Sequence, residues 1–97
     1  MRYYNDSTNK YEDLILTDND LSVKEIVEQM YEEKPTLFIV DLSNRTQEYY
    51  NTVVGITNNR LWAVIDHYCE MLITEKYSEW YMKGVDERLD NTRKEVI

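Results

Sequence analysis

The side chains in this chain that could do covalent or acid–base chemistry are few. His67 is the only histidine and Cys69 is the only cysteine. A nucleophilic pair of the two would need the imidazole beside the thiol, but residues two positions apart on one helix point away from each other. We therefore expect Cys69 to be a packed thiol and His67 to be a surface imidazole.

The remaining candidates for chemistry are carboxylates. Asp66, His67 and Glu70 could reach one divalent ion from a single helical turn, although such a trio on an exposed face is usually solvated. Asp41 ends an apolar run and, together with Ser43, is expected to cap a turn. The sequence also has no glycine-rich phosphate loop. It therefore predicts a protein that is not an enzyme and has no metal site and no cofactor.

Acidic residues dominate the charge of the chain, which has a net charge of −8. Between residues 12 and 33, Lys24 is the one basic residue among eight carboxylates. Such a balance opposes direct phosphate binding and favours basic partners, although solubility alone also explains many acidic surfaces. Together with Tyr31, which could anchor an interface, these carboxylates are the predicted partner-binding residues: Glu12, Asp13, Asp18, Asp20, Glu25, Glu28, Glu32 and Glu33.

The length of 97 residues predicts a single domain over 1–97, with a polar and frayed start at 1–10. No apolar run approaches the ~18–20 residues that a membrane span needs, and the N-terminus lacks the apolar stretch of a secretion signal. We expect a cytoplasmic protein that does not bind membranes.

The clearest local pattern predicts a helix over about 22–34. Ser22 and Glu25 have the spacing of a capping box, and Pro35 should end the helix. Its apolar residues recur with helical spacing at Val23, Ile26, Val27, Met30 and Tyr31. Glu25, Glu28 and Glu32 then form an acidic ridge on the opposite face.

The middle of the chain favours strands. Residues 36–42 form an apolar run rich in branched side chains, which is typical of a buried strand. Residues 48–56 and 60–65 are also dense in strand-forming types, and Asn58-Asn59 between them suits a tight hairpin turn. The predicted fold is α+β, with a three-stranded antiparallel meander over about 36–66.

Two further helices are predicted after the meander. A long helix over about 67–83 would place Tyr68, Cys69, Leu72, Ile73 and Trp80 on one face. Lys83-Gly84 is expected to end it, because glycine readily adopts the left-handed conformation, and a short terminal helix would follow. A short strand is also expected from Tyr11 towards Asp18.

Residues 47–66 also fit an alternative, a helix-turn-helix with Gly55 at the turn. The resemblance to that motif covers about a fifth of the chain and fails at Asn51, where the family has alanine because the two helices approach closely. In this interpretation Asn58, Asn59 and Arg60 would contact nucleic acid. Arg60 is the one dependable cation of the predicted recognition helix, whereas attraction to a duplex requires several.

In size, acidity and lack of catalytic groups the chain resembles small inhibitors encoded by phages and mobile elements, among them anti-CRISPR proteins and DNA mimics. This resemblance implies an acidic protein that occupies the nucleic-acid channel of a bacterial defence enzyme. The leading hypothesis is therefore a non-enzymatic inhibitor of a basic, nucleic-acid-binding protein such as a defence nuclease. The alternatives are the helix-turn-helix regulator and a structural oligomerisation module that uses the aromatic face of the last helices, for example as a homodimer.

Overall fold

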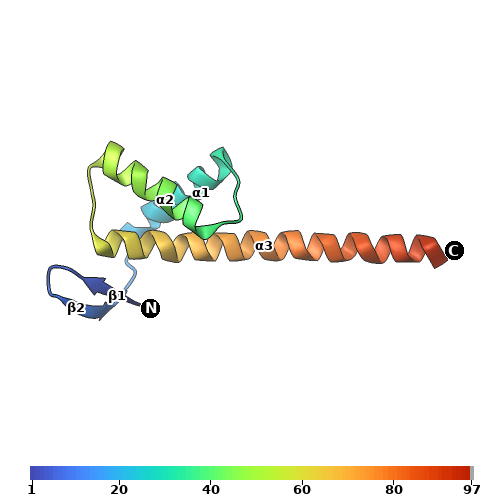
Figure 1. The fold of residues 1–97 in the computed structure, drawn as a ribbon, viewed down its shortest axis with the longest axis horizontal. Coiled ribbons are helices and arrows are strands. Elements are labelled where there is room, and N and C mark those ends of the chain that lie inside the picture. Colours follow the sequence, from blue (N-terminus) through green and yellow to red (C-terminus); the bar gives the residue numbers. More distant parts are fainter. Residues whose placement is uncertain (97) are drawn as a thin grey trace.

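The computed structural model describes the backbone of residues 1–96 and the side chains of residues 1–82. A hairpin of β1 (Arg2–Asn5) and β2 (Lys10–Asp13) leads through a 3-10 turn (Asp18–Asp20) into α1 (Leu21–Glu33). Then come α2 (Ile39–Tyr49), a π-helical segment (Tyr50–Val54) and α3 (Asn59–Val96). Helices α1 and α2 pack on one side of α3 and the hairpin lies on the other, while the C-terminal part of α3 continues past them all (Figure 1).

The core lies between the three helices and is supplied by all of them. Val23 and Val27 of α1 are buried against Leu42 of α2, and α3 contributes the largest share. The buried residues of the core are Val23, Val27, Leu42, Tyr50, Val64, Ile65, Tyr68, Cys69 and Ile73. The predicted apolar stripe of the first helix is thus confirmed.

The boundaries of α1 follow from its end residues. Glu33 is its last residue and Lys34 is already extended, at φ −147°, because the following Pro35 disfavours helical geometry. The start differs from the predicted Ser22 capping box. Ser22 lies inside the helix and its hydroxyl donates to the carbonyl of Asn19, while the Asp20 carboxylate accepts from the backbone N–H of Thr17 at 2.8 Å.

The three-stranded meander predicted over about 36–66 is wrong, because that region is mostly helical. In the apolar run 36–42 only Leu42 is buried, while Phe38 is 70% and Val40 67% exposed. The buried positions Leu42, Thr46 and Tyr50 recur every four residues, which is a helical period. The branched residues of the run suggested a strand, but the buried positions from Leu42 to Tyr50 follow the helical period, and the segment forms a helix.

The segment expected to be the hairpin turn connects two helices instead. Gly55 ends the π-helical segment in the left-handed conformation, at φ 77°, and the N–H of Ile56 donates to the Tyr50 carbonyl at 2.9 Å. The Asn51 side chain accepts a hydrogen bond from the Thr57 hydroxyl and so holds the loop. Asn58 caps α3, since its Oδ1 accepts from the N–H of Leu61 at 2.7 Å.

The predicted boundaries of the last helices are also wrong. Helix α3 begins at Asn59 rather than near residue 67, and it runs through Gly84 to Val96 without a separate terminal helix. Glycine inside a helix costs only about 1 kcal/mol, so it does not oblige the helix to end. Trp80 lies on the same side of the helix as Cys69 and Ile73 by its spacing, but it is exposed.

The only sheet in the described residues is the N-terminal hairpin. Strands β1 and β2 are antiparallel, with Tyr4 opposite Tyr11 and Arg2 opposite Asp13. The region 1–10, expected to be frayed, therefore contains β1 and the turn. The strand expected from Tyr11 towards Asp18 corresponds to β2, which ends at Asp13.

Candidate protein-binding surface

The acidic ridge predicted on the first helix lies on its solvent-facing side. Glu25, Glu28 and Glu32 are all exposed on α1. Their spacing of three and four residues places them on one face, about 4.5 and 6 Å apart along the axis. Among the described side chains, none forms a hydrogen bond or ion pair with these three carboxylates, so they are open to a cation from outside.

Beside this ridge, a groove of about 390 Å³ lies between α1 and α3. Glu28, Tyr31 and Glu32 line it from α1, and Leu72, Glu75 and Lys76 line it from α3. Glu75 therefore joins the carboxylates of α1 across the groove. The Lys76 amino group lies 6.0 Å from the centre of the Tyr31 ring and 3.7 Å from the Glu79 carboxylate, so its charge is partly balanced within the chain.

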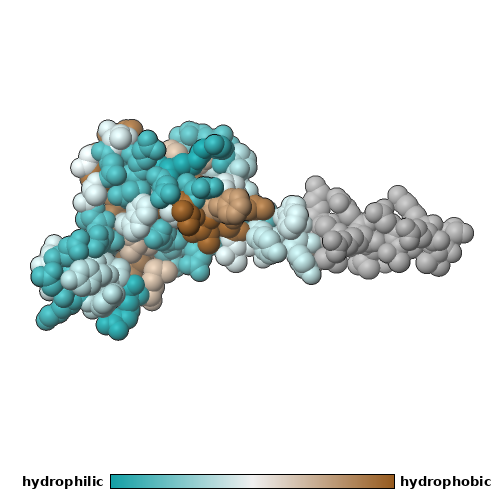
Figure 2. Space-filling view, viewed as in Figure 1, coloured by the Kyte–Doolittle hydropathy of each residue, from teal (hydrophilic) through white to brown (hydrophobic). Residues whose placement is uncertain are grey.

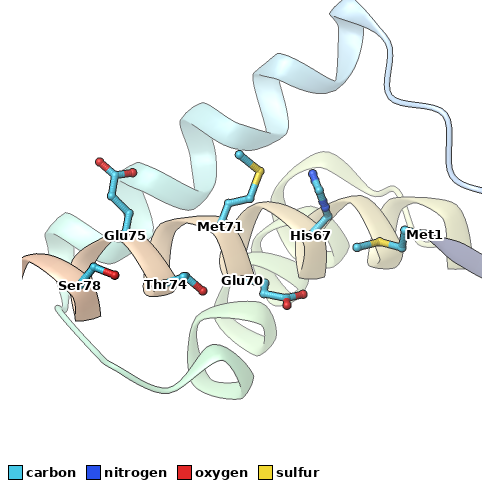
Figure 3. Close-up of a pocket in the computed structure, with 7 residues that line it drawn as sticks. All are labelled: Met1, His67, Glu70, Met71, Thr74, Glu75 and Ser78. Carbon is cyan, nitrogen blue, oxygen red and sulfur yellow. The ribbon is translucent and has the colours of Figure 1, made fainter.

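A second and shallower groove of about 540 Å³ continues along α3 (Figure 3). Met71 and Glu75 belong to its lining, and both also line a small cleft with Glu28. Figure 3 shows Glu75, Met71 and His67 pointing to the α1 side of α3, while Glu70 points to the other side. We call Glu25, Glu28 and Glu32 of α1 with Glu75 of α3 the acidic surface; Tyr31 and Met71 supply its apolar part.

The remaining predicted carboxylates lie apart from the acidic surface. Asp13 is exposed on β2, 3.9 Å from the Arg2 guanidinium, and Asp18 is exposed in the 3-10 turn. Glu33, at the end of α1, accepts from Gln29 Nε2 at 3.4 Å. Carboxylates that lie close together in the sequence therefore belong to three different elements: β2, the 3-10 turn and α1.

Glu12 and Asp20 are used inside the chain. Glu12 accepts hydrogen bonds from Asn5 and Thr8, each at 3.0 Å, and these bonds lower the pKa of its carboxyl. Asp20 is buried and forms a two-bonded ion pair with Arg60, at 3.0 and 2.7 Å. The Arg60 hydrogen bonds lower the Asp20 pKa to about 2. Both carboxylates hold the fold together.

The three residues assigned to nucleic acid in the helix-turn-helix alternative also bond within the chain. Asn58 caps α3, Asn59 Nδ2 donates to the Tyr4 carbonyl at 3.0 Å, and Arg60 binds Asp20 and the Ile15 carbonyl. Both sides of the turn at Gly55 are helical, since residues 47–54 belong to the end of α2 and the π-helical segment and residues 59–66 begin α3. However, the hairpin lies along the face of α3 formed by Asn59, Trp62, Ala63 and Asp66, which such a motif would turn towards DNA.

The residues considered for chemistry have ordinary surroundings. Cys69 is fully buried, and burial raises the pKa of its thiol to about 11, so it carries no thiolate near neutral pH. The His67 ring packs edge-on against the Tyr68 ring, with centroids 5.4 Å apart. Within the described side chains, no three His, Cys, Asp or Glu residues are grouped to hold a metal ion.

The contribution of α3 to the acidic surface was not predicted from the sequence. Glu75 falls within the helix predicted over about 67–83, but nothing in the sequence linked it to the carboxylates of α1. Contact between two helices depends on tertiary packing, and the acidic character shared by positions 28, 32 and 75 was the only available signal.

Comparison with known proteins adds no relationship to this picture. The chain matches no protein-family model, and neither the curated proteins nor the solved structures include a significant match to it. Within the described part of the chain, no helix combines the length and the apolar character needed to cross a membrane.

Proposed function

We propose that this chain is a non-enzymatic interaction protein whose acidic surface binds a basic protein and thereby inhibits its contact with nucleic acid. The supporting observation is that Glu28 and Glu32 line one groove with Glu75, and that Glu25 continues their ridge along α1. Because this arrangement concentrates negative charge next to apolar side chains, it suits a partner that presents Lys or Arg near an apolar contact.

The spacing of the ridge supports a nucleic-acid-binding partner in particular. Three carboxylates over about 10 Å of helix give roughly one charge per 5 Å. A DNA strand carries one phosphate per about 3.4 Å of axis, so a protein site built for consecutive phosphates could accept the ridge. Tyr31 and Met71 would add apolar contacts that a phosphate backbone cannot make. A bacterial defence nuclease is one example of a basic, nucleic-acid-binding partner.

The test is charge reversal of the ridge. The triple variant Glu25→Lys/Glu28→Lys/Glu32→Lys changes three exposed side chains outside the core, so it should fold normally. A control variant, Asp6→Lys/Asp13→Lys/Asp18→Lys, changes three other exposed carboxylates and alters the net charge equally. Each protein is immobilised, exposed to a bacterial lysate with and without nuclease treatment, and eluted with salt steps.

We expect the native chain and the control to retain a basic, nucleic-acid-binding protein, which elutes as salt rises. The ridge variant should lose it. The purified partner should then lose nucleic-acid binding when the native chain is added, but not when the ridge variant is added. Equal retention by both variants would reject the acidic surface as the binding site, and retention that depends on nucleic acid would reject mimicry.

A further inference from the structure

Exposed apolar side chains gather where α3 leaves the rest of the molecule. Phe38 is 70% exposed at the start of α2, and Trp80 is 61% exposed on α3. The connection that leads into α2 lies against α3 there, since Pro35 and Lys76 line the same groove. Figure 2 shows brown, apolar atoms gathered at the end of the body from which the helix emerges. We call the exposed residues Leu37, Phe38, Val40, Tyr77, Trp80 and Tyr81 the neck patch.

The neck patch continues the buried stripe of α3. Cys69 and Ile73 lie in the core, and Tyr77 and Trp80 follow at the helical intervals of four and three residues. The rings of Tyr77 and Trp80 lie 5.9 Å apart and form one aromatic surface. The side of α3 that packs on α1 and α2 therefore extends beyond them as uncovered aromatic area, which is typical of a contact surface.

The length of α3 is a second argument for a partner, because part of this helix has no tertiary packing among the described elements. Its ribbon runs to Val96, and none of the other described elements lies alongside its C-terminal part (Figure 1). A helical stretch without tertiary packing is marginal in water, and Gly84 within it costs about 1 kcal/mol more. A second helix packed along the neck would supply the missing stabilisation.

The charges around the neck patch permit contact between two copies. The net charge of −8 makes copies repel, so self-association requires a face where the signs balance. Lys34, Asp41 and Arg45 surround Phe38, and Lys76 pairs with Glu79 beside Trp80. Glu28, Glu32 and Glu75 of the acidic surface line the adjoining groove with Pro35 and Lys76, so they border the neck patch without being part of it.

The area is also adequate for a symmetric contact. Phe38, Tyr77, Trp80 and Tyr81 are each more than half exposed. At 150–250 Å² for each aromatic side chain, they offer roughly 300–500 Å² per copy. Leu37 and Val40 add to this and bring the total towards the ~800 Å² per partner of a standard interface. We propose that a second copy of this chain docks on the neck patch and forms a closed dimer with two-fold symmetry.

The experiment is sedimentation equilibrium of the untagged full chain at about 10 µM and at physiological salt. The native chain should have the mass of two chains, falling to one on dilution. Trp80→Lys and Phe38→Lys should each raise the dimer dissociation constant about tenfold or more, because each places a charge in the contact. The matched control is Ile15→Lys, which changes an equally exposed apolar residue outside the neck patch.

A spectroscopic measurement gives a second readout. The variant Trp62→Phe leaves Trp80 as the only tryptophan, and its emission should shift to shorter wavelength as dimers form. A native chain that stays monomeric, or Trp80→Lys and Phe38→Lys variants that dimerise as well as Ile15→Lys, would overturn the proposal. The acidic surface uses other residues, so failure of the dimer would leave the proposed function standing, and loss of partner binding in the ridge variant would leave the dimer intact.

Discussion

At the scale of single residues, the pair Asp20–Arg60 shows how one ion pair can organise a small molecule. Arg60 lies in the first turn of α3, and it binds both the Asp20 carboxylate and the Ile15 carbonyl. Asp20 also accepts from Thr17, so the 3-10 turn and the start of α1 are fixed to α3 through two side chains. The ion pair thus joins two segments of the fold that are 40 positions apart in the sequence.

The sequence could not separate Asp20 from its acidic neighbours. All eight carboxylates between residues 12 and 33 look alike by type and local charge, and the feature that distinguishes Asp20 is a partner 40 positions away. Glu25, Glu28 and Glu32 could be placed correctly, because their exposure follows from the apolar stripe on the other side of the same helix.

The ion pair makes stability depend on acid pH. The Asp20 pKa falls from an ordinary 3.8 to about 2 in the folded protein, so its stabilisation is complete above about pH 4 and is lost as pH falls through 2. A pKa shift of that size corresponds to about 2 kcal/mol in the free energy of unfolding at neutral pH. We expect Asp20→Asn to lower the free energy of unfolding by roughly that amount at pH 7, measured by urea denaturation.

The matched control for this prediction is Asp18→Asn, which removes an exposed carboxylate from the same 3-10 turn. It should leave stability within about 0.5 kcal/mol of the native value. The difference between the native chain and Asp20→Asn should shrink as pH falls from 4 towards 2. A difference that stays constant over this window would show that the loss comes from packing rather than from the ion pair.

At the scale of elements, the success of sequence reasoning followed the strength of each local signal. Helix α1 could be predicted because an apolar stripe and Pro35 agree. Helix α2 and the first turns of α3 were taken for strands because Ile39, Val40 and Val64 are branched types that favour strands. Tertiary packing overrides such a preference, and burial of Leu42 and Thr46 on one face of α2 decided the helix.

The two glycines of the chain give a prediction at this scale, because they occupy opposite environments. Gly55 has φ 77° and ends a helix, with no atom within 4 Å of the place where a Cβ would stand. Gly55→Ala should therefore cost about 1–2 kcal/mol through backbone strain alone. Gly84 lies inside α3, so Gly84→Ala should favour the helix by up to about 1 kcal/mol.

Urea denaturation measures the first effect, and ellipticity at the helical wavelength measures the second. Gly55→Asn serves as the control, since asparagine tolerates the left-handed conformation and should cost less than alanine. A loss of helix in Gly84→Ala would mean that Gly84 ends α3 after all.

At the scale of the whole molecule, the chain is an N-terminal body with a helix that projects from it. The Cα radius of gyration is 18.0 Å, whereas a compact chain of this length would have about 12–13 Å. This asymmetry could not be predicted from the sequence, because Lys83-Gly84 has the composition of a helix end. The acidic surface belongs to the body, whereas the neck patch lies at the place where α3 leaves the body.

The body should therefore fold without the projecting helix. Every buried apolar residue of the described core lies between Val23 and Ile73, so the chain cut after Ser78 retains the entire core. We expect this truncated chain to unfold cooperatively, within about 4 °C of a full-length Trp80→Lys reference measured at a concentration at which that variant sediments as a monomer. Its radius of gyration by X-ray scattering should be about 12 Å. If the truncated chain unfolded or aggregated, residues 79–97 would have to pack on the body in solution, and the separation of body and projecting helix would be wrong.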